Sequence, residues 1–107
     1  MKITITPWQH GCHDIVVVTT RGITTEQVKG WSNGLFGIRH SYDAWIITHL
    51  PSKMAVCGAG TFGQAKERAD SLTALEGWDK MYRRNGRWVI PRALTIAVHV
   101  LRESWNG

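Results

Sequence analysis

The chain has 107 residues, of which 43% are hydrophobic and 20% charged. This size and composition predict one globular domain, residues 1–107, and exclude a two-domain arrangement. Thirteen lysines and arginines against eight acidic residues give a net charge of +5, which favours nucleic acid or acidic protein surfaces as partners without choosing between them. Two cysteines, Cys12 and Cys57, are too few for the disulfide framework of a small secreted scaffold. We therefore expect a cytoplasmic protein with free thiols.

Residues at the beginning of the chain predict strands rather than a targeting signal. Met1 to Thr6 alternates polar and apolar residues up to Pro7, which is typical of a strand, and lacks the long apolar core of a signal peptide. Asp14 to Thr20 is rich in β-branched residues and predicts a second, buried strand. Between them we expect a loop from Trp8 to His13. The longer apolar runs elsewhere are too short to cross a bilayer, so no membrane association is expected.

The middle of the chain predicts a short helix and then a meander. Thr24 or Thr25 caps a helix through Trp31, which Asn33-Gly34 ends. Three strands are expected to follow, joined by tight turns. Their ranges are 35–40, 44–50 and 53–57.

Two further segments have helical patterns. Thr61 and Gln64 form a capping box, and apolar residues recur at helical spacing from Phe62 to Leu72. The last helix starts at Pro91 and runs to Trp105. Its apolar stripe is expected at Leu94, Ala97, Val98, Leu101 and Trp105, widened by Ile96 and Val100, with Arg92, Thr95, His99, Arg102 and Glu103 facing solvent.

The segment between these two helices allows two interpretations. Residues from Trp78 to Tyr82 fit one or two helical turns that end at Asn85-Gly86, and this is the preferred interpretation. The same Asn-Gly pair can also form the turn of a hairpin. The complete pattern predicts an α+β fold, an antiparallel sheet of about five strands with helices packed mainly on one face.

Basic and aromatic residues concentrate in one acid-free segment, residues 80–92. The candidate binding residues are Lys80, Tyr82, Arg83, Arg84, Arg87, Trp88 and Arg92. Cationic side chains interleaved with rings suit an anionic partner, because the charges hold it and the rings cover apolar or base surface. A solvated basic connector is the alternative interpretation of this segment.

Histidines and cysteines allow a metal or nucleophile hypothesis. His10, Cys12 and His13 lie close enough in sequence to supply zinc ligands, which His40, His49 or Cys57 would complete. The second pair of ligands that structural zinc sites require is missing from the spacing, so we predict no metal and no cofactor. The corresponding enzyme hypothesis is a nucleophile activated by a histidine, either Cys12 beside His13 or Cys57 with a histidine on a neighbouring strand. Because adjacent residues of a strand point to opposite faces, the pair Cys12 and His13 is expected to diverge.

Two resemblances add to this interpretation. The region from Leu35 to Leu75, with three strands followed by the helix in Gly58-Ala59-Gly60-Thr61-Phe62-Gly63-Gln64-Ala65-Lys66-Glu67-Arg68-Ala69, resembles the unit of double-stranded-RNA-binding domains and of the arm-type domain of phage integrases. It departs from the former in lacking their lysine cluster. Size, basic balance and tryptophan content are similar to those of small accessory proteins of bacteriophages and mobile elements, including anti-CRISPR proteins.

We therefore expect a non-enzymatic binding protein. The resemblance implies a phage or mobile-element accessory factor or inhibitor that occupies a surface of a host protein or nucleoprotein complex. Direct binding of DNA or RNA through residues 80–92 is the first alternative, and a small Cys/His or zinc-dependent enzyme is the second.

Overall fold

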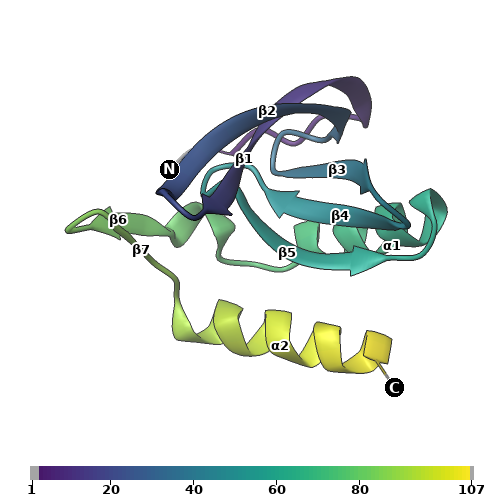
Figure 1. Ribbon diagram of the computed structural model, residues 1–107. Helices are drawn as coiled ribbons and strands as arrows, with labels where there is room; N and C mark the ends of the chain where they lie inside the picture. The colour runs from purple at the N-terminus through teal and green to yellow at the C-terminus, as the bar shows by residue number, and fades with distance from the viewer. Residues whose placement is uncertain (1–2, 107) are drawn as a thin grey trace.

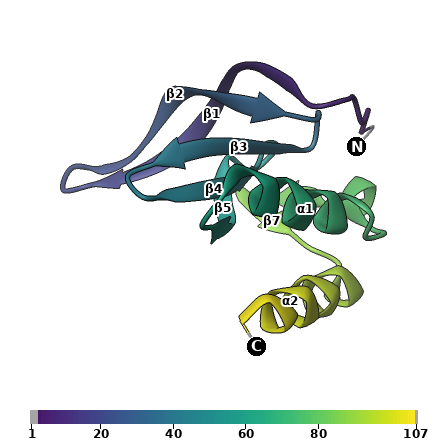
Figure 2. The same ribbon diagram turned by 90° about the vertical axis from the view of Figure 1, so that its right-hand side faces the viewer.

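Five antiparallel strands form a meander in which neighbours in the sheet are also neighbours in the chain. The computed structural model describes residues 3–106. The strands are β1 (Gln9–Thr19), β2 (Gly22–Ser32), β3 (Phe36–Ser41), β4 (Ala44–His49) and β5 (Met54–Ala59). Two helices, α1 (Phe62–Thr73) and α2 (Arg92–Asn106), lie on the side of the sheet away from the β1–β2 hairpin (Figures 1 and 2). The expected α+β fold is confirmed.

The β1–β2 hairpin differs most from the sequence prediction. β1 begins at Gln9 and so includes most of the expected loop, and β2 replaces the expected helix. The two strands are in register along 11 residues each, from Gln9 opposite Ser32 to Thr19 opposite Gly22. Cross-strand hydrogen bonds and the β-branched residues at the start of β2 outweigh the local cap signal at Thr24 or Thr25.

The expected first strand is wrong for the residues that the structure describes. Residues 3–8 belong to no strand, and Met1 and Lys2 lie outside the described residues. This segment is instead held by isolated contacts. The backbone N–H of Thr6 donates to the carbonyl oxygen of Asn33 at 2.8 Å, and Trp8 reaches α1.

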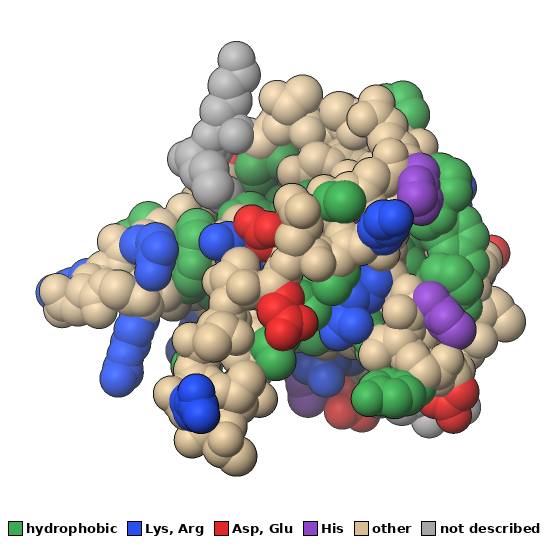
Figure 3. All heavy atoms as spheres, turned by 45° about the horizontal axis from the view of Figure 1, so that its top comes forward, with side chains coloured by type: hydrophobic (Ala, Val, Ile, Leu, Met, Phe, Trp, Pro, Cys, Tyr) green, Lys and Arg blue, Asp and Glu red, His purple; other side chains and the backbone are tan. Residues whose placement is uncertain are grey.

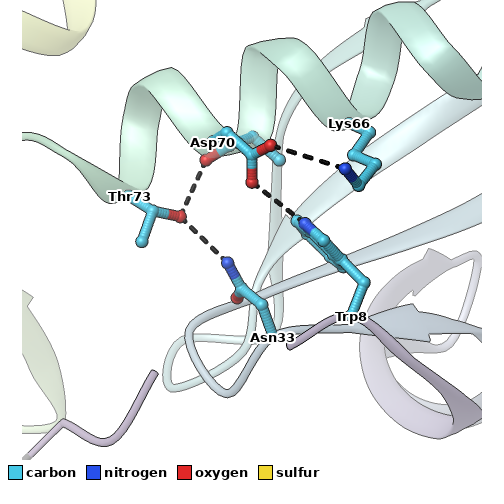
Figure 4. Close-up of polar contacts among 6 residues, drawn as sticks. Trp8, Asn33, Lys66, Asp70 and Thr73 are labelled. Atoms are coloured by element: carbon cyan, nitrogen blue, oxygen red, sulfur yellow. Dashed lines mark hydrogen bonds and ion pairs between the residues drawn. The ribbon is translucent and has the colours of Figure 1, made fainter. Parts of the chain in front are cut away.

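The contacts of Trp8 and Asn33 join two distant segments, the one before β1 and the β2–β3 turn, to α1 (Figure 4). The Trp8 indole Nε1–H donates to Asp70 Oδ1 at 2.9 Å, and Lys66 Nζ lies 3.9 Å from the other carboxylate oxygen. The Asn33 side chain donates to Thr73 Oγ1 at 3.1 Å and accepts the backbone N–H groups of Leu35 and Phe36. Asn33 therefore shapes the β2–β3 turn as well as attaching it to the helix.

The sheet is curved, and its two faces have different partners. The N–H of Val16 in β1 donates to the carbonyl oxygen of Lys53 at 2.8 Å, so the first strand also reaches the β4–β5 turn. One face packs on α1 through Phe36, Ile38 and Ile47, which are fully buried. Because successive side chains alternate between faces, Gly37 lies on the opposite face, beneath the buried ring of His13.

The helix α1 forms as its sequence predicts. Thr61 Oγ1 accepts the backbone N–H of Gln64 at 3.1 Å, and Gln64 Oε1 accepts the N–H of Gly60 at 3.1 Å. The reciprocal half of the capping box thus falls one residue before the cap. The predicted helical face, including Ala65, Ala69 and Leu72, is buried against the sheet.

The segment after α1 is a hairpin, so the preferred helical interpretation is wrong. A single 3-10 turn, η1 (Trp78–Lys80), leads into β6 (Tyr82–Arg84) and β7 (Arg87–Val89), which form a separate two-stranded sheet. Asn85 and Gly86 have positive φ of 52° and 76°. Two successive left-handed residues characterise the two-residue turn that matches the twist of hairpin strands.

The helix α2 forms over the predicted range, but it packs on α1 rather than across the sheet. Leu94 is buried and Leu101 and Trp105 are half-buried, with the Arg68 guanidinium 5.4 Å from the centre of the Trp105 ring. Ile96 and Val100 are exposed, so the expected widening of the stripe is wrong. Within the described residues, neither helix combines the length and the apolar character needed to span a bilayer.

Candidate interaction surface

The predicted basic-aromatic segment is distributed over three elements. Lys80 ends η1, the central residues form the β6–β7 hairpin, and Arg92 begins α2. Lys80 lines a cavity of about 600 Å³ together with the acidic Glu76 and Asp79. Lys80 and Arg92 are thus outside the hairpin, and the purely basic part of the candidate site is the hairpin itself.

Strand register divides the hairpin residues between two faces. Tyr82 is opposite Val89, Arg83 is opposite Trp88, and Arg84 is opposite Arg87. Directly opposed residues share a face, and successive residues alternate. Tyr82, Arg84, Arg87 and Val89 therefore lie on one face, whereas Arg83 and Trp88 lie on the other.

The Arg83–Trp88 face turns toward the body of the protein. The Trp88 ring is half-buried, with its centre 6.4 Å from that of the His49 ring at the end of β4. The Arg83 guanidinium lies 5.7 Å from the Trp88 ring centre and donates to the Gly86 carbonyl oxygen at 3.1 Å. Trp88 thus attaches the hairpin to the sheet, and the contacts of the Arg83 guanidinium are with other residues of the hairpin.

The opposite face presents two arginines side by side. Arg84 and Arg87 form the last cross-strand pair before the turn, and both are exposed. Like charges directly opposite one another destabilise a strand pair, and the structure shows no ion pair for either arginine among the described residues. The hairpin projects from the body at the left of Figure 3, where cationic side chains extend from it. The exposed Tyr82 completes this surface.

A second feature, which sequence reasoning missed, is a groove beside the hairpin. It has a volume of about 370 Å³ and is bounded by the β4–β5 region, by Trp78 and the hairpin, and by α2. Its walls are His49, Ser52, Met54, Ala55, Val56, Trp78, Met81, Trp88, Ile90, Leu94, Thr95, Val98, His99 and Arg102. Three of these, Thr95, His99 and Arg102, are exposed as the helical pattern predicts and also border the open groove. The groove depends on the placement of α2, which the helical pattern does not reveal.

His49 lies in the wall of this groove as a buried neutral base. Burial lowers its pKa from 6.5 to about 4, because desolvation disfavours the charged ring. Its Nδ1 lies 2.8 Å from Ser52 Oγ, whereas its buried Nε2 has no hydrogen-bond partner among the described residues. The rings of Phe36 and Trp78 have centres 5.8 and 5.1 Å from that of His49. An aromatic enclosure of this kind explains the low pKa.

The residues of the zinc hypothesis are not brought together. His10 and Cys12 share one face of β1, and His13 points to the other. No cluster of three or more histidine, cysteine or acidic side chains that could hold a metal occurs within residues 3–106. His10 packs edge-on against Trp31, and Cys12 is exposed.

The geometry does not assemble the Cys-His nucleophile either. Cys12 and His13 point to opposite faces of β1. Burial raises the pKa of the Cys57 thiol, and the nearby cations Arg68 and Arg102 offset only part of this effect. An activated cysteine requires a lowered pKa, so the environment of Cys57 favours the unreactive thiol.

These features define an α+β protein with an exposed basic hairpin beside an apolar groove. Comparisons with known proteins give it no further identity, since no protein-family model, curated protein or solved structure matches the chain.

Proposed function

We propose that this protein is a non-enzymatic binding protein that uses the β6–β7 hairpin to occupy an acidic surface of a macromolecular partner. The observation that carries the proposal is the exposed pair Arg84 and Arg87. Two guanidinium groups held opposite each other repel and destabilise the free protein. An anionic group of a partner attracts both guanidinium groups and so offsets their mutual repulsion in the complex.

The distribution of the rings favours a protein surface over single-stranded nucleic acid. Stacking on single strands uses successive exposed aromatic rings, and Tyr82 is the one ring of the hairpin on the arginine face, since Trp88 packs toward His49. An exposed tyrosine flanked by arginines has the composition of a protein interface, in which Tyr and Arg are enriched.

The class of target follows from the resemblance to small phage and mobile-element accessory proteins. We infer a host protein or nucleoprotein complex in the bacterial cytoplasm. Direct binding of DNA or RNA through phosphate contacts is the alternative, because the net charge of +5 attracts both classes of partner.

A pull-down from bacterial lysate, with and without nuclease, tests the proposal. The double variant Arg84→Glu/Arg87→Glu should lose the proteins that the wild type retains. The matched control Arg21→Glu/Lys29→Glu makes the same change in net charge on the exposed β1–β2 hairpin and should keep them. Thermal unfolding of both variants checks that the fold is intact.

The outcomes separate the alternatives. Retention that survives nuclease supports a protein target. Retention that disappears with nuclease, together with affinity for isolated DNA or RNA that falls log-linearly with salt, supports the nucleic-acid alternative. Equal retention by the wild type and the Arg84/Arg87 variant contradicts the role of the hairpin.

A further inference from the structure

The groove between α2 and the sheet has the properties of a small-molecule site. Its volume of about 370 Å³ lies within the ~300–1,000 Å³ range that is usual for such sites. Trp78, Trp88 and Leu94 line it from η1, the hairpin and α2. It exists because the packing of α2 on α1 leaves the strip of sheet around Val56 uncovered.

Apolar side chains of the groove are left open to solvent. Met54 and Ile90 in its walls are 58% and 45% exposed. Covering such surface is favourable, because it removes apolar area from water. An occupant with a hydrocarbon or aromatic body gains this free energy.

The charge in the walls has one sign. No carboxylate lines the groove, whereas Arg102 does. The structure gives the Arg102 guanidinium no ion pair or hydrogen bond with a described residue. The other ionisable groups of the walls are His49, which is buried and neutral, and His99, whose Nε2 lies 3.7 Å from Glu103 on the exposed side of α2. Arg102 is therefore the cation available to an occupant.

We propose that this groove binds an apolar carboxylate, a compound with a hydrocarbon or aryl body and one carboxylate head. The body lies against Trp78, Trp88 and Leu94, and the head pairs with Arg102. A single guanidinium matches a carboxylate in charge and in the planar geometry of two parallel hydrogen bonds. The proposal does not depend on the partner of the hairpin, although Trp88 belongs to both features.

Phenylacetate is the probe, and phenethyl alcohol is its uncharged counterpart. Titration of ¹⁵N-labelled protein is followed through the indole N–H signals of the tryptophans. Trp78 and Trp88 should shift in a saturable way, with a dissociation constant on the order of 1 mM for a ligand of this size. The Trp8 signal should stay in place, because Trp8 is not among the residues that line the groove and its indole N–H lies against Asp70 of α1.

Variants separate the roles of the charge and of the groove. Arg102→Gln should weaken phenylacetate binding about ten-fold, as loss of a charge-assisted hydrogen bond predicts, and leave the binding of the alcohol unchanged. Arg92→Gln makes the same charge change on α2 outside the groove walls and should have no effect. Val98→Asp should abolish binding of both probes while the Trp8 signal shows that the fold persists.

Two results would overturn the proposal. The first is the absence of saturable shifts at Trp78 and Trp88 in the wild type at about 10 mM phenylacetate, ten times the expected dissociation constant. The second is equal binding of phenylacetate by the wild type and Arg102→Gln, which would leave a groove without preference for a carboxylate.

Discussion

The ring of His13 in β1 lies in the space that a side chain at position 37 of β3 would need. A Cβ atom built on Gly37 would be 2.7 Å from His13 Nε2, and His13 is only 7% exposed, so its ring has little room to move. Both ring nitrogens are buried without a hydrogen-bond partner among the described residues. A large buried residue in one strand thus packs directly over a glycine in another.

Gly37→Ala should destabilise the protein by roughly 1–3 kcal/mol, because overpacking forces a buried ring to shift. The free energy of unfolding in urea measures this. Gly63→Ala is the control, since a Cβ there meets no atom within 4 Å and should stabilise α1 by up to about 1 kcal/mol. If the clash is the cause, adding His13→Ala to Gly37→Ala should give a double variant whose loss is smaller than the sum of the single losses.

Stability should fall as the pH falls, because of His49. Its pKa is lowered from 6.5 to about 4 in the folded state, so between these values the unfolded chain binds the proton and the folded protein does not. Well above pH 6.5 the ring of His49 is neutral in both states and does not affect the free energy of unfolding. As the pH drops from 6.5 toward 4, protonation of the unfolded chain lowers that free energy by an amount that reaches on the order of 2–3 kcal/mol.

Urea unfolding at pH 7.5 and 4.5 measures this difference. His49→Phe should reduce the pH dependence, whereas His99→Gln, which borders the same groove but has an exposed side chain, should preserve it. An unchanged difference in His49→Phe would assign the effect to other groups.

Leu94 in α2 is almost completely buried, at 1% exposure. Leu94→Ala should therefore cost roughly 2–5 kcal/mol. Ile96→Ala, at a position that is 53% exposed, should change the free energy of unfolding by no more than about 0.5 kcal/mol. Thermal unfolding distinguishes the two, and equal shifts of the midpoint would mean that α2 buries a different face.

The Trp8–Asp70 hydrogen bond should contribute measurably to holding the segment before β1 against α1. Trp8→Phe keeps an aromatic ring but loses the donor, and should cost about 1 kcal/mol or slightly more. Lys66→Gln removes the exposed ion pair with the same carboxylate and should change stability by less than about 0.5 kcal/mol. Hydrogen exchange of the Thr6 backbone N–H, bonded to Asn33, should quicken in Trp8→Phe and not in Lys66→Gln.

The amino-acid sequence alone determined the helices and strands whose caps, side-chain periodicity and turn residues lie within a few residues of each other. The cap formed by Thr61 and Gln64, the start of α2 after Pro91, and the three strands from β3 to β5 follow from side-chain period, caps and turn residues. These signals depend on contacts between near neighbours in the chain. The fold class follows from their order.

Tertiary structure decided the rest. Thr24 and Thr25 suit the start of a helix, but pairing with β1 along the whole strand places them in β2. Asn85-Gly86 suits either a helix end or a hairpin turn, and the packing of Trp88 near His49 favours the hairpin. The groove requires α2 to lie on α1 instead of across the sheet. Such outcomes depend on contacts between residues far apart in sequence, whose free energies exceed the small preferences of local segments.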